Sequence, residues 1–375
     1  MRKRNKNQPE GSDPTRRVFI RDVSLAAVGM GLAGSCACAK KQQSSGLLHR
    51  DTMRYRILGR TGLNVSEIGL GGHYDGPKRL QKRAEEQWQR NAVFQECLKS
   101  GINYYDTNTE QERESFGRAL KTMLGCREKI VIVTDINDQE GTGQAMYDFM
   151  MKSIDEQLST LQLPSVDILR YTTVAMKTPP ERIQAAIQAF KAMKRAGKTR
   201  YFAVAQHDPD LLLKWIKQYE EIDVIYTPYN YFMPKAEEEL FPEAKKRNMG
   251  VIVIKPFNKG FLFNPKLIET MAIGKGIRSI IERIQREGKN RTAEDLIGST
   301  RSTLAQASLR YILSNENIST VIPGMETVDE VFENRMVERG DSFGKTDQDV
   351  LEHFAAHVET VLPENYQWLK RWRHA

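Results

Sequence analysis

Several residues that can carry protons directly follow short apolar runs of this sequence. Asp106, Asp135 and Lys255 each come after a β-rich run, and His73 and His207 hold similar positions. Carboxylates, imidazoles and amines are the side chains that act in general acid–base catalysis. If the runs are parallel strands of a barrel, their carboxyl ends meet on one face, so we expect these side chains to share one site. For the two histidines the alternative is a hydrogen-bonded loop residue, and for Lys255 it is a structural pair with Asp135.

The elements that would position these residues alternate regularly along the chain. The eight predicted strands are residues 68–71, 102–105, 130–134, 166–171, 201–205, 224–226, 251–254 and 320–322. The runs of helical periodicity between them are residues 84–99, 114–124, 145–161, 181–195, 211–219, 235–247 and 303–313. Eight strands alternating with helices is the count of an α/β fold of the (β/α)8 TIM barrel type. An open doubly wound sheet is the competing architecture, but no Gly-x-Gly-x-x-Gly follows an early strand.

Three further segments surround this pattern. Residues 55–68 alternate around two glycines, which predicts an N-terminal β-hairpin. Residues 258–302 separate strand seven from its helix and predict a long insert, either a functional lid or a solvated extension. We therefore expect a barrel domain at 53–340 and a C-terminal helical tail at 341–375.

The N-terminus resembles an export signal. Arg16 and Arg17 precede a weakly apolar stretch, residues 23–33, which is too short to span a bilayer as a permanent helix. Paired arginines before such a stretch are typical of the twin-arginine (Tat) signal. We therefore predict a signal peptide at 1–38, with the twin-arginine export machinery as partner, and a polar linker at 39–52.

Small residues at the end of this leader are compatible with two kinds of processing. Residues 33–36 resemble a lipoprotein cleavage box, which would leave Cys36 lipidated and the protein attached to a membrane. Cleavage after Ala39 fits the small-x-small rule of the ordinary peptidase equally well. Both predict an exported protein, which is either periplasmic or a membrane-anchored lipoprotein.

The charge of the chain argues against a nucleic-acid partner. The formal charge is +8, from 56 basic and 48 acidic residues. Residues 1–35 hold seven Arg/Lys and three Asp/Glu, so they supply +4 and the remaining chain also supplies +4. Without its leader the protein is therefore only weakly basic. The four cysteines are too few for a disulfide scaffold in a chain of this length. The partner that we expect for the barrel is a small-molecule substrate.

Several sequence strings resemble the aldo/keto reductase superfamily, and together they cover roughly residues 53 to 335. In chain order they are residues 56–66, 101–107, 197–201, 229–230, and 322–324 with 333–334. Each string alone is weak, but five in the correct order and spacing are a strong signal. The resemblance implies a barrel that binds a nicotinamide cofactor, NAD(P), and transfers hydride to or from a carbonyl carbon.

The resemblance also implies a catalytic tetrad of Asp, Tyr, Lys and His, of which this chain retains one member. The Asp is Asp106, while the Tyr position holds Gln111. The Lys position holds Asp135, and the His position holds Thr172. Ordinary carbonyl reduction therefore does not follow from the sequence, and His207, His73 or Lys255 would have to replace the missing acid/base groups.

The same comparison indicates where a cofactor would bind. The residues that it places beside the cofactor are Gln206, Tyr229, Asn230, Gly324, Met325, Glu333 and Asn334. Gln206 suits a carboxamide, the backbone amides after Gly324 suit a phosphate, and the Glu333–Asn334 pair suits an adenine edge. Glu330 stands where the family often has a phosphate-binding Arg, which favours NAD over NADP because a carboxylate repels a 2′-phosphate.

Three functions remain open at this point. The first is an exported aldo/keto reductase-like oxidoreductase that acts on a polar carbonyl or alcohol with bound NAD(P). The second is a metal-assisted lyase or isomerase, with the same histidines and aspartates as ligands. The third is a non-catalytic barrel that binds a small ligand, which the loss of three tetrad residues supports.

Overall fold

The protein is represented by a computed structural model, in which residues 51–375 form one compact unit. The structure describes residues 53–72, 87–123, 125–173, 178–231, 233–257, 304–335, 337 and 344. The predictions for the signal peptide, the linker, the insert at 258–302, the tail apart from residue 344, and His73 lie outside these residues.

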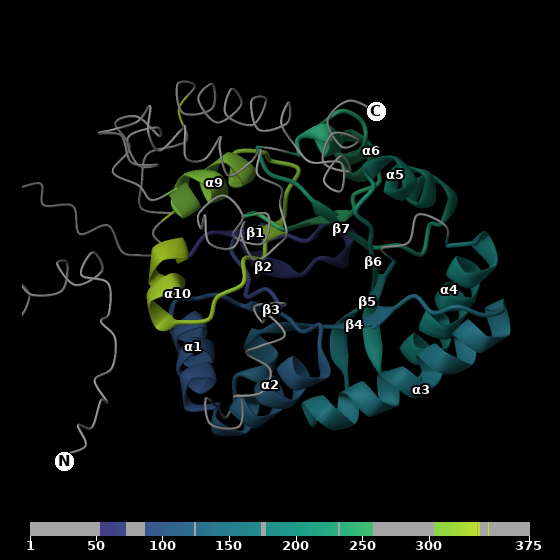
Figure 1. The fold of residues 1–375 in the computed structure, drawn as a ribbon, viewed down its shortest axis with the longest axis horizontal. Coiled ribbons are helices and arrows are strands. Elements are labelled where there is room, and N and C mark those ends of the chain that lie inside the picture. Colours follow the sequence, from purple (N-terminus) through teal and green to yellow (C-terminus); the bar gives the residue numbers. More distant parts are fainter. Residues whose placement is uncertain are drawn as a thin grey trace, which may run out of the picture. The chain divides into compact units, whose positions relative to one another are not determined.

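Seven parallel strands form the main sheet and pair in chain order (Figure 1). They are β3 (Tyr104–Asp106), β4 (Val131–Asn137), β5 (Val166–Thr172), β6 (Thr199–Ala205), β7 (Val224–Pro228), β8 (Gly250–Ile254) and β9 (Thr320–Val321). The segment at 68–71 bridges both edges of this sheet, with Ile68 beside Val321 on β9 and Leu70 beside Tyr105 on β3. Both edges are thus paired to one segment, as in a closed (β/α)8 barrel.

Helices follow the strands and lie on the outer side of the sheet (Figure 1). They are α1 (Gln87–Lys99), α2 (Glu110–Thr122), α3 (Gly143–Leu161), α4 (Pro180–Arg195), α5 (Pro209–Gln218), α6 (Leu240–Lys246), α9 (Leu304–Leu313) and α10 (Val328–Arg335). Among these described helices, not one combines the length and apolar composition that crossing a bilayer requires.

Two of these helices differ from the sequence prediction. Helix α2 begins at Glu110 rather than 114, because the Thr109 side chain accepts from the Glu112 amide while the Glu112 carboxylate accepts from the Thr109 amide. This capping box satisfies amides that would otherwise lack partners at the helix start. The single helix predicted at 235–247 is divided into a 3-10 turn, Lys235–Glu237, and the short α6.

The barrel interior is filled by alternate residues of the strands. Tyr104 on β3, Val133 on β4 and Ile168 on β5 belong to one buried cluster inside the ring of strands. Because successive strand residues point to opposite faces, the residues two positions later share this inward direction. The strands therefore bring Asp106, Asp135 and Arg170 toward one point at their carboxyl ends.

The N-terminal hairpin lies against the residues just before β8. Its strands, β1 (Tyr55–Ile57) and β2 (Asn64–Ser66), pair antiparallel. Gly59, in the turn between them, has a φ of 49°, and the Arg60 amide donates to the Asn248 carbonyl. A Cβ on Gly59 would lie 2.3 Å from the backbone nitrogen of Gly250, so only glycine permits this close approach.

Substituting Gly59 tests this contact against a matched control. We expect Gly62→Ala to cost about 1–2 kcal/mol, because its φ of 68° is left-handed but no atom lies within 4 Å of the place that its Cβ would occupy. Gly59→Ala should cost about 1–3 kcal/mol more, because it combines the same backbone strain with overpacking. Urea unfolding measures both free energies, and equal costs would show that the close approach is absent.

Candidate active site

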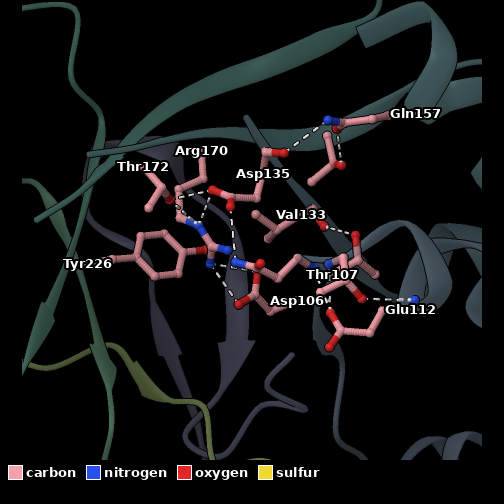
Figure 2. A network of polar contacts seen from close by, with 12 residues as sticks. Asp106, Thr107, Glu112, Val133, Asp135, Gln157, Arg170, Thr172 and Tyr226 are labelled. Carbon is pink, nitrogen blue, oxygen red and sulfur yellow. Dashed lines mark hydrogen bonds and ion pairs between the residues drawn. The ribbon is translucent and has the colours of Figure 1, made fainter. Parts of the chain in front are cut away.

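The centre of the site is a buried guanidinium held between two carboxylates (Figure 2). Arg170 Nη1 lies 2.8 and 2.7 Å from the two carboxylate oxygens of Asp106, and its Nε lies 2.8 Å from Asp135 Oδ1. The side chains are 4% exposed for Arg170, 5% for Asp106 and 0% for Asp135. Charge-assisted hydrogen bonds of this length are the strong ones, and they allow three charged groups to be buried together.

Neighbouring polar groups fix Asp135 in this position. Thr172 donates to its Oδ1, and Asn108 Nδ2 donates to its Oδ2 over 3.0 Å. The Gln157 side chain on α3 donates to the Asp135 backbone carbonyl over 2.9 Å (Figure 2). Asp135 therefore has partners on both carboxylate oxygens and its backbone, which restricts the direction of its charge.

Two buried tyrosines lie beside the guanidinium. The Tyr226 ring is 4.8 Å from the Arg170 guanidinium carbon, which is a cation–π distance (Figure 2). The hydroxyl groups of Tyr226 and Tyr104 share a hydrogen bond. Burial raises the pKa of both phenols, so they stay neutral and contribute packing and one mutual hydrogen bond.

The electrostatics of the cluster differ between its members. Burial raises the pKa of Asp106 above its usual range; Arg170 acts in the opposite direction, and Asp135 and Glu112 raise the pKa further. Burial alone would lower the pKa of Arg170, but the two aspartates raise it well above its ordinary value. The guanidinium therefore stays charged, and Asp106 is a carboxyl group that retains a proton to higher pH than an exposed aspartate.

A second polar group occupies the ends of β6, β7 and β8. Lys255 Nζ lies 3.4 Å from His207 Nδ1, and Asn230 Nδ2 donates to the Lys255 carbonyl over 2.9 Å. Lys255 has a φ of 53°, a left-handed conformation that is uncommon for a non-glycine residue and is found more often at functional sites. The backbone thus turns sharply where β8 ends.

Gln206 contributes a donor with no partner to this group. Its Oε1 accepts from the amides of His207 and Asp208 over 2.6 and 3.1 Å. Its Nε2 is buried and has no hydrogen-bond partner among the residues that the structure describes, and the residue is 1% exposed. An unsatisfied buried amide costs free energy, so this donor is suited to an acceptor on a bound molecule.

The structure separates the candidate residues predicted from the sequence into those at the site and those elsewhere. Asp106, Asp135 and Thr172 meet around Arg170, while His207 and Lys255 contact one another. The pairing of Lys255 with Asp135 stays a prediction, and Arg170 is a cation that contacts both Asp106 and Asp135. Tyr229, which the resemblance places beside the cofactor, packs against Tyr311 and Phe241.

The Tyr229 side chain lies in the layer between the strands and the outer helices. Its ring stacks on Tyr311 at 5.7 Å and contacts the edge of Phe241, and its hydroxyl donates to Glu237. This packing leaves the ring 1% exposed. The expected contact between Tyr229 and a cofactor therefore finds no support in the position of its side chain.

Arg170 is the principal residue that the sequence prediction missed. The sequence predicts a strand at 166–171, and Arg170 is a charged residue inside this strand rather than at its end. The available signal was the alternation of the strand, because an arginine two residues after the inward-facing Ile168 must share its direction. A charged residue on an interior face needs a buried partner.

The metal-assisted alternative lacks a ligand set in the described part of the chain. No group of three or more His, Cys, Asp or Glu residues with metal-binding geometry occurs there. The physical reason is that Arg170 already occupies oxygens of both aspartates, and the His207 Nδ1 contacts Lys255.

The sequence profile of the aldo/keto reductase family matches residues 67–346, which is most of the chain. The chain belongs to the aldo/keto reductase family. The aldo/keto reductase barrel thus accounts for the parallel strands and the helices around them.

Known relatives and structures agree with this family. L-Galactose dehydrogenase from Arabidopsis thaliana is 27% identical over 325 residues, which cover 84% of this chain and 96% of that protein. Pyridoxal 4-dehydrogenase from Microbacterium luteolum is 22% identical over 329 residues, covering 76% and 93%. The holo form of an aldo-keto reductase from Bacillus halodurans superposes with a TM-score of 0.64 at 22% identity, covering 84% of this chain and 99% of that one, which shows the shared fold.

The start of α10, where this aldo/keto reductase was predicted to bind phosphate, has its own acidic cap. Glu330 Oε2 accepts from the amides of Glu326 and Thr327 over 2.6 and 3.2 Å. The Thr327 hydroxyl accepts from the Glu330 amide in return. Two of the amides after Gly324 therefore already have an intramolecular acceptor, and the carboxylate places negative charge at the helix N-terminus.

Removing the central cation should unfold the site at neutral pH. Arg170→Met leaves two carboxylates buried together, and we expect a loss of about 3–5 kcal/mol in the free energy of unfolding. The loss should be smaller at pH 5 than at pH 8, because one carboxyl can then hold a proton. Arg200→Met is the control, because the Arg200 side chain that pairs with Asp167 is 56% exposed. Its loss should lower the free energy of unfolding by less than about 1 kcal/mol. Denaturant unfolding at both pH values measures these free energies. If Arg170→Met loses the same free energy of unfolding at pH 5 and pH 8, the two aspartates are not left as unpaired buried charges.

Proposed function

We propose that this aldo/keto reductase is an oxidoreductase that transfers hydride between bound NAD(P) and a small polar carbonyl or alcohol. The observation that carries the proposal is the buried Asp106–Arg170–Asp135 cluster at the carboxyl ends of the strands, where barrel enzymes place their chemistry. A buried charged cluster costs folding free energy, and such a cost is common at functional sites.

The catalytic set that we propose departs from that of the family. Asp106 is retained, whereas Gln111, Asp135 and Thr172 occupy the positions that the resemblance assigns to Tyr, Lys and His. The lost positive charge of the Lys is supplied by Arg170, which approaches Asp106 from β5. A cation beside the retained aspartate is therefore preserved, although it comes from a different strand.

Residues at the carboxamide and adenine positions fit a nicotinamide cofactor, whereas two of the amides expected at its phosphate are already capped by Glu330. The orphan Nε2 of Gln206 matches the acceptor oxygen of a carboxamide, and Asn334 on α10 is buried at the position expected near an adenine. A bound nicotinamide supplies or accepts the hydride of the reaction. Glu330 at the start of α10 favours NAD over NADP, because its carboxylate would repel a 2′-phosphate.

The substrate that we propose is a small polyhydroxy or similarly polar compound. Among the described residues at the strand ends, the Asp106 carboxyl and the unpaired Nε2 of Gln206 are polar groups that suit a substrate rich in hydroxyl groups. The relatives include dehydrogenases that are named for L-galactose and for pyridoxal, both of which carry polar substituents.

Cofactor binding provides the test of this function. Titration with NADH and NADPH, together with native mass spectrometry of protein made with its leader, should show bound nicotinamide and tighter binding of NADH. Gln206→Glu keeps an acceptor for the two backbone amides but removes the Nε2 donor, so NADH should bind about 10-fold more weakly. Gln144→Glu, on the exposed face of α3, should leave the affinity unchanged. Absence of nicotinamide binding in the wild type, with binding of a polyol, would instead identify a non-catalytic ligand-binding barrel.

We also propose that the protein is exported after folding. Free nicotinamide cofactor is not expected outside the cytoplasm, so export of a folded chain would carry a tightly held cofactor with it. The supporting observation is the sequence around Arg16 and Arg17, which resembles a twin-arginine signal. Membrane attachment would then depend on lipidation of Cys36.

Substitution of the arginine pair tests the export route. Arg16→Lys combined with Arg17→Lys keeps the charge of the leader, so a merely basic leader would still function. We expect this double variant to remain in the cytoplasm with its leader uncleaved, while the wild type is processed and recovered outside it. Cell fractionation with mass measurement of the N-terminus reports both, and unchanged export of the variant would exclude this signal. Cys36→Ala should release the exported protein from membranes if that cysteine is lipidated.

A further inference from the structure

In the part of the chain that the structure describes, the buried cluster holds two carboxylates and a guanidinium that contacts both of them. Arg170 uses Nη1 for Asp106 and Nε for Asp135, so the cluster carries a net charge of −1 when both carboxyl groups are ionised. A single added proton would make it neutral. In a buried site, neutral clusters are favoured because desolvation penalises net charge.

The two carboxylates are not equivalent in their access to a ligand. Asp135 is fully buried, and both of its oxygens accept hydrogen bonds from Thr172, Asn108 and Arg170. Asp106 retains 5% exposure, and its described partner is Arg170. Both Asp106 oxygens accept from the same Nη1 of Arg170, but Asp106 is the more exposed carboxylate of the two and is therefore the one that a bound molecule can reach.

We propose that Asp106 is the proton donor and acceptor of the reaction, in place of the tyrosine expected for the family, and that Arg170 is the positioning residue that holds it. This inference rests on the proposed function, because it assigns a role within hydride transfer. It differs from the sequence prediction, which gave the proton to His207, His73 or Lys255.

The charged and titratable groups around Asp106 agree with this role. Arg170 faces it from β5, Asp135 from β4 and Glu112 from α2, and the phenols of Tyr104 and Tyr226 also lie within its electrostatic influence. Burial, Asp135 and Glu112 raise the pKa of Asp106, and Arg170 limits that rise. A raised pKa is what a carboxyl group needs to act as an acid near neutral pH.

The proposed step balances in both directions. In reduction, the substrate's carbonyl carbon receives a hydride with its electron pair from reduced nicotinamide, and the carbonyl π bond breaks. The oxygen takes the proton from Asp106, so one C–H and one O–H bond form and the nicotinamide is oxidised. Asp106 is left as a carboxylate paired with Arg170, and solvent returns its proton. Oxidation of the alcohol is the reverse, with the Asp106 carboxylate accepting the proton.

Infrared titration of the protein without substrate tests the shared proton directly. We expect the carbonyl band of a protonated carboxyl to persist well above pH ~3.9, the ordinary aspartate value. Asp106→Asn should remove this band. Asp167→Asn should retain it, because Asp167 is a buried carboxylate that pairs with Arg127 and Arg200 away from the cluster. An identical titration in wild type and Asp106→Asn would overturn the proposal.

The pH dependence of turnover tests the catalytic role. Reduction should slow as pH rises through the pKa of Asp106, and oxidation should slow as pH falls through it. Asp106→Asn should lower kcat about 10²–10⁴-fold in both directions while NADH affinity changes less than about 3-fold. Asp135→Asn should move both pH limits to lower pH, because it removes a charge that raises the pKa of Asp106. Arg170→Lys, which keeps the positive charge without the planar fork, should shift both pH limits while retaining part of the wild-type turnover.

These measurements separate failure of the inference from failure of the proposed function. Turnover by Asp106→Asn close to the wild-type rate, with NADH bound normally, would reject Asp106 as the proton carrier and leave the oxidoreductase intact. If no nicotinamide binds, the oxidoreductase proposal fails and so does this catalytic role, whereas the infrared band would still show that the cluster holds a proton.

Discussion

The rest of the site depends on the burial of one guanidinium between two carboxylates. A buried arginine is stable only when its charge is matched and its donors have acceptors, and Asp106 and Asp135 meet both requirements for Nη1 and Nε. Asp135 in turn needs Thr172 and Asn108 to satisfy its oxygens. The cluster therefore links β3, β4 and β5 through charge, in addition to their backbone pairing.

The fold makes this cluster possible by filling the rest of the barrel with apolar side chains. Tyr104, Val133 and Ile168 occupy the layer below the three charged residues, and Tyr226 covers the guanidinium from β7. This low-dielectric surrounding strengthens the interactions among the charges and raises the cost of leaving any of them unpaired. Burial, with the negative charges of Asp135 and Glu112, therefore raises the pKa of Asp106 although pairing with Arg170 opposes that rise.

Membership of the aldo/keto reductase family accounts for the barrel, but this chain has a different set of charges at its mouth. A lysine paired with an aspartate would be a single ion pair, whereas Arg170 serves two aspartates at once. The planar fork of arginine suits this arrangement, because it directs donors to two acceptors in fixed directions. At α10, Glu330 similarly uses one carboxylate to cap the helix and to place negative charge at the helix start.

Local periodicity in the sequence was enough to predict most helices and seven of the eight strands, whereas residues 68–71 form isolated bridges to the edges of the sheet. It placed Asp106 at the end of its strand, whereas Asp135, predicted to follow a strand, lies within β4, which continues to Asn137. It did not predict the early start of α2, although Thr109 and Glu112 carry the spacing of a capping box. The start of α2 is thus encoded locally, by two residues three positions apart.

The pairing of charges was decided by tertiary structure alone. Asp106 and Arg170 are 64 residues apart, and no local pattern indicates that a strand-interior arginine will reach across one strand to a second carboxylate. The same holds for Tyr229, which the end of a strand directs into the outer core, and for Lys255, whose backbone turns its amine toward His207. Periodicity depends on residues a few positions apart, whereas ion pairing depends on the register and curvature of the whole sheet.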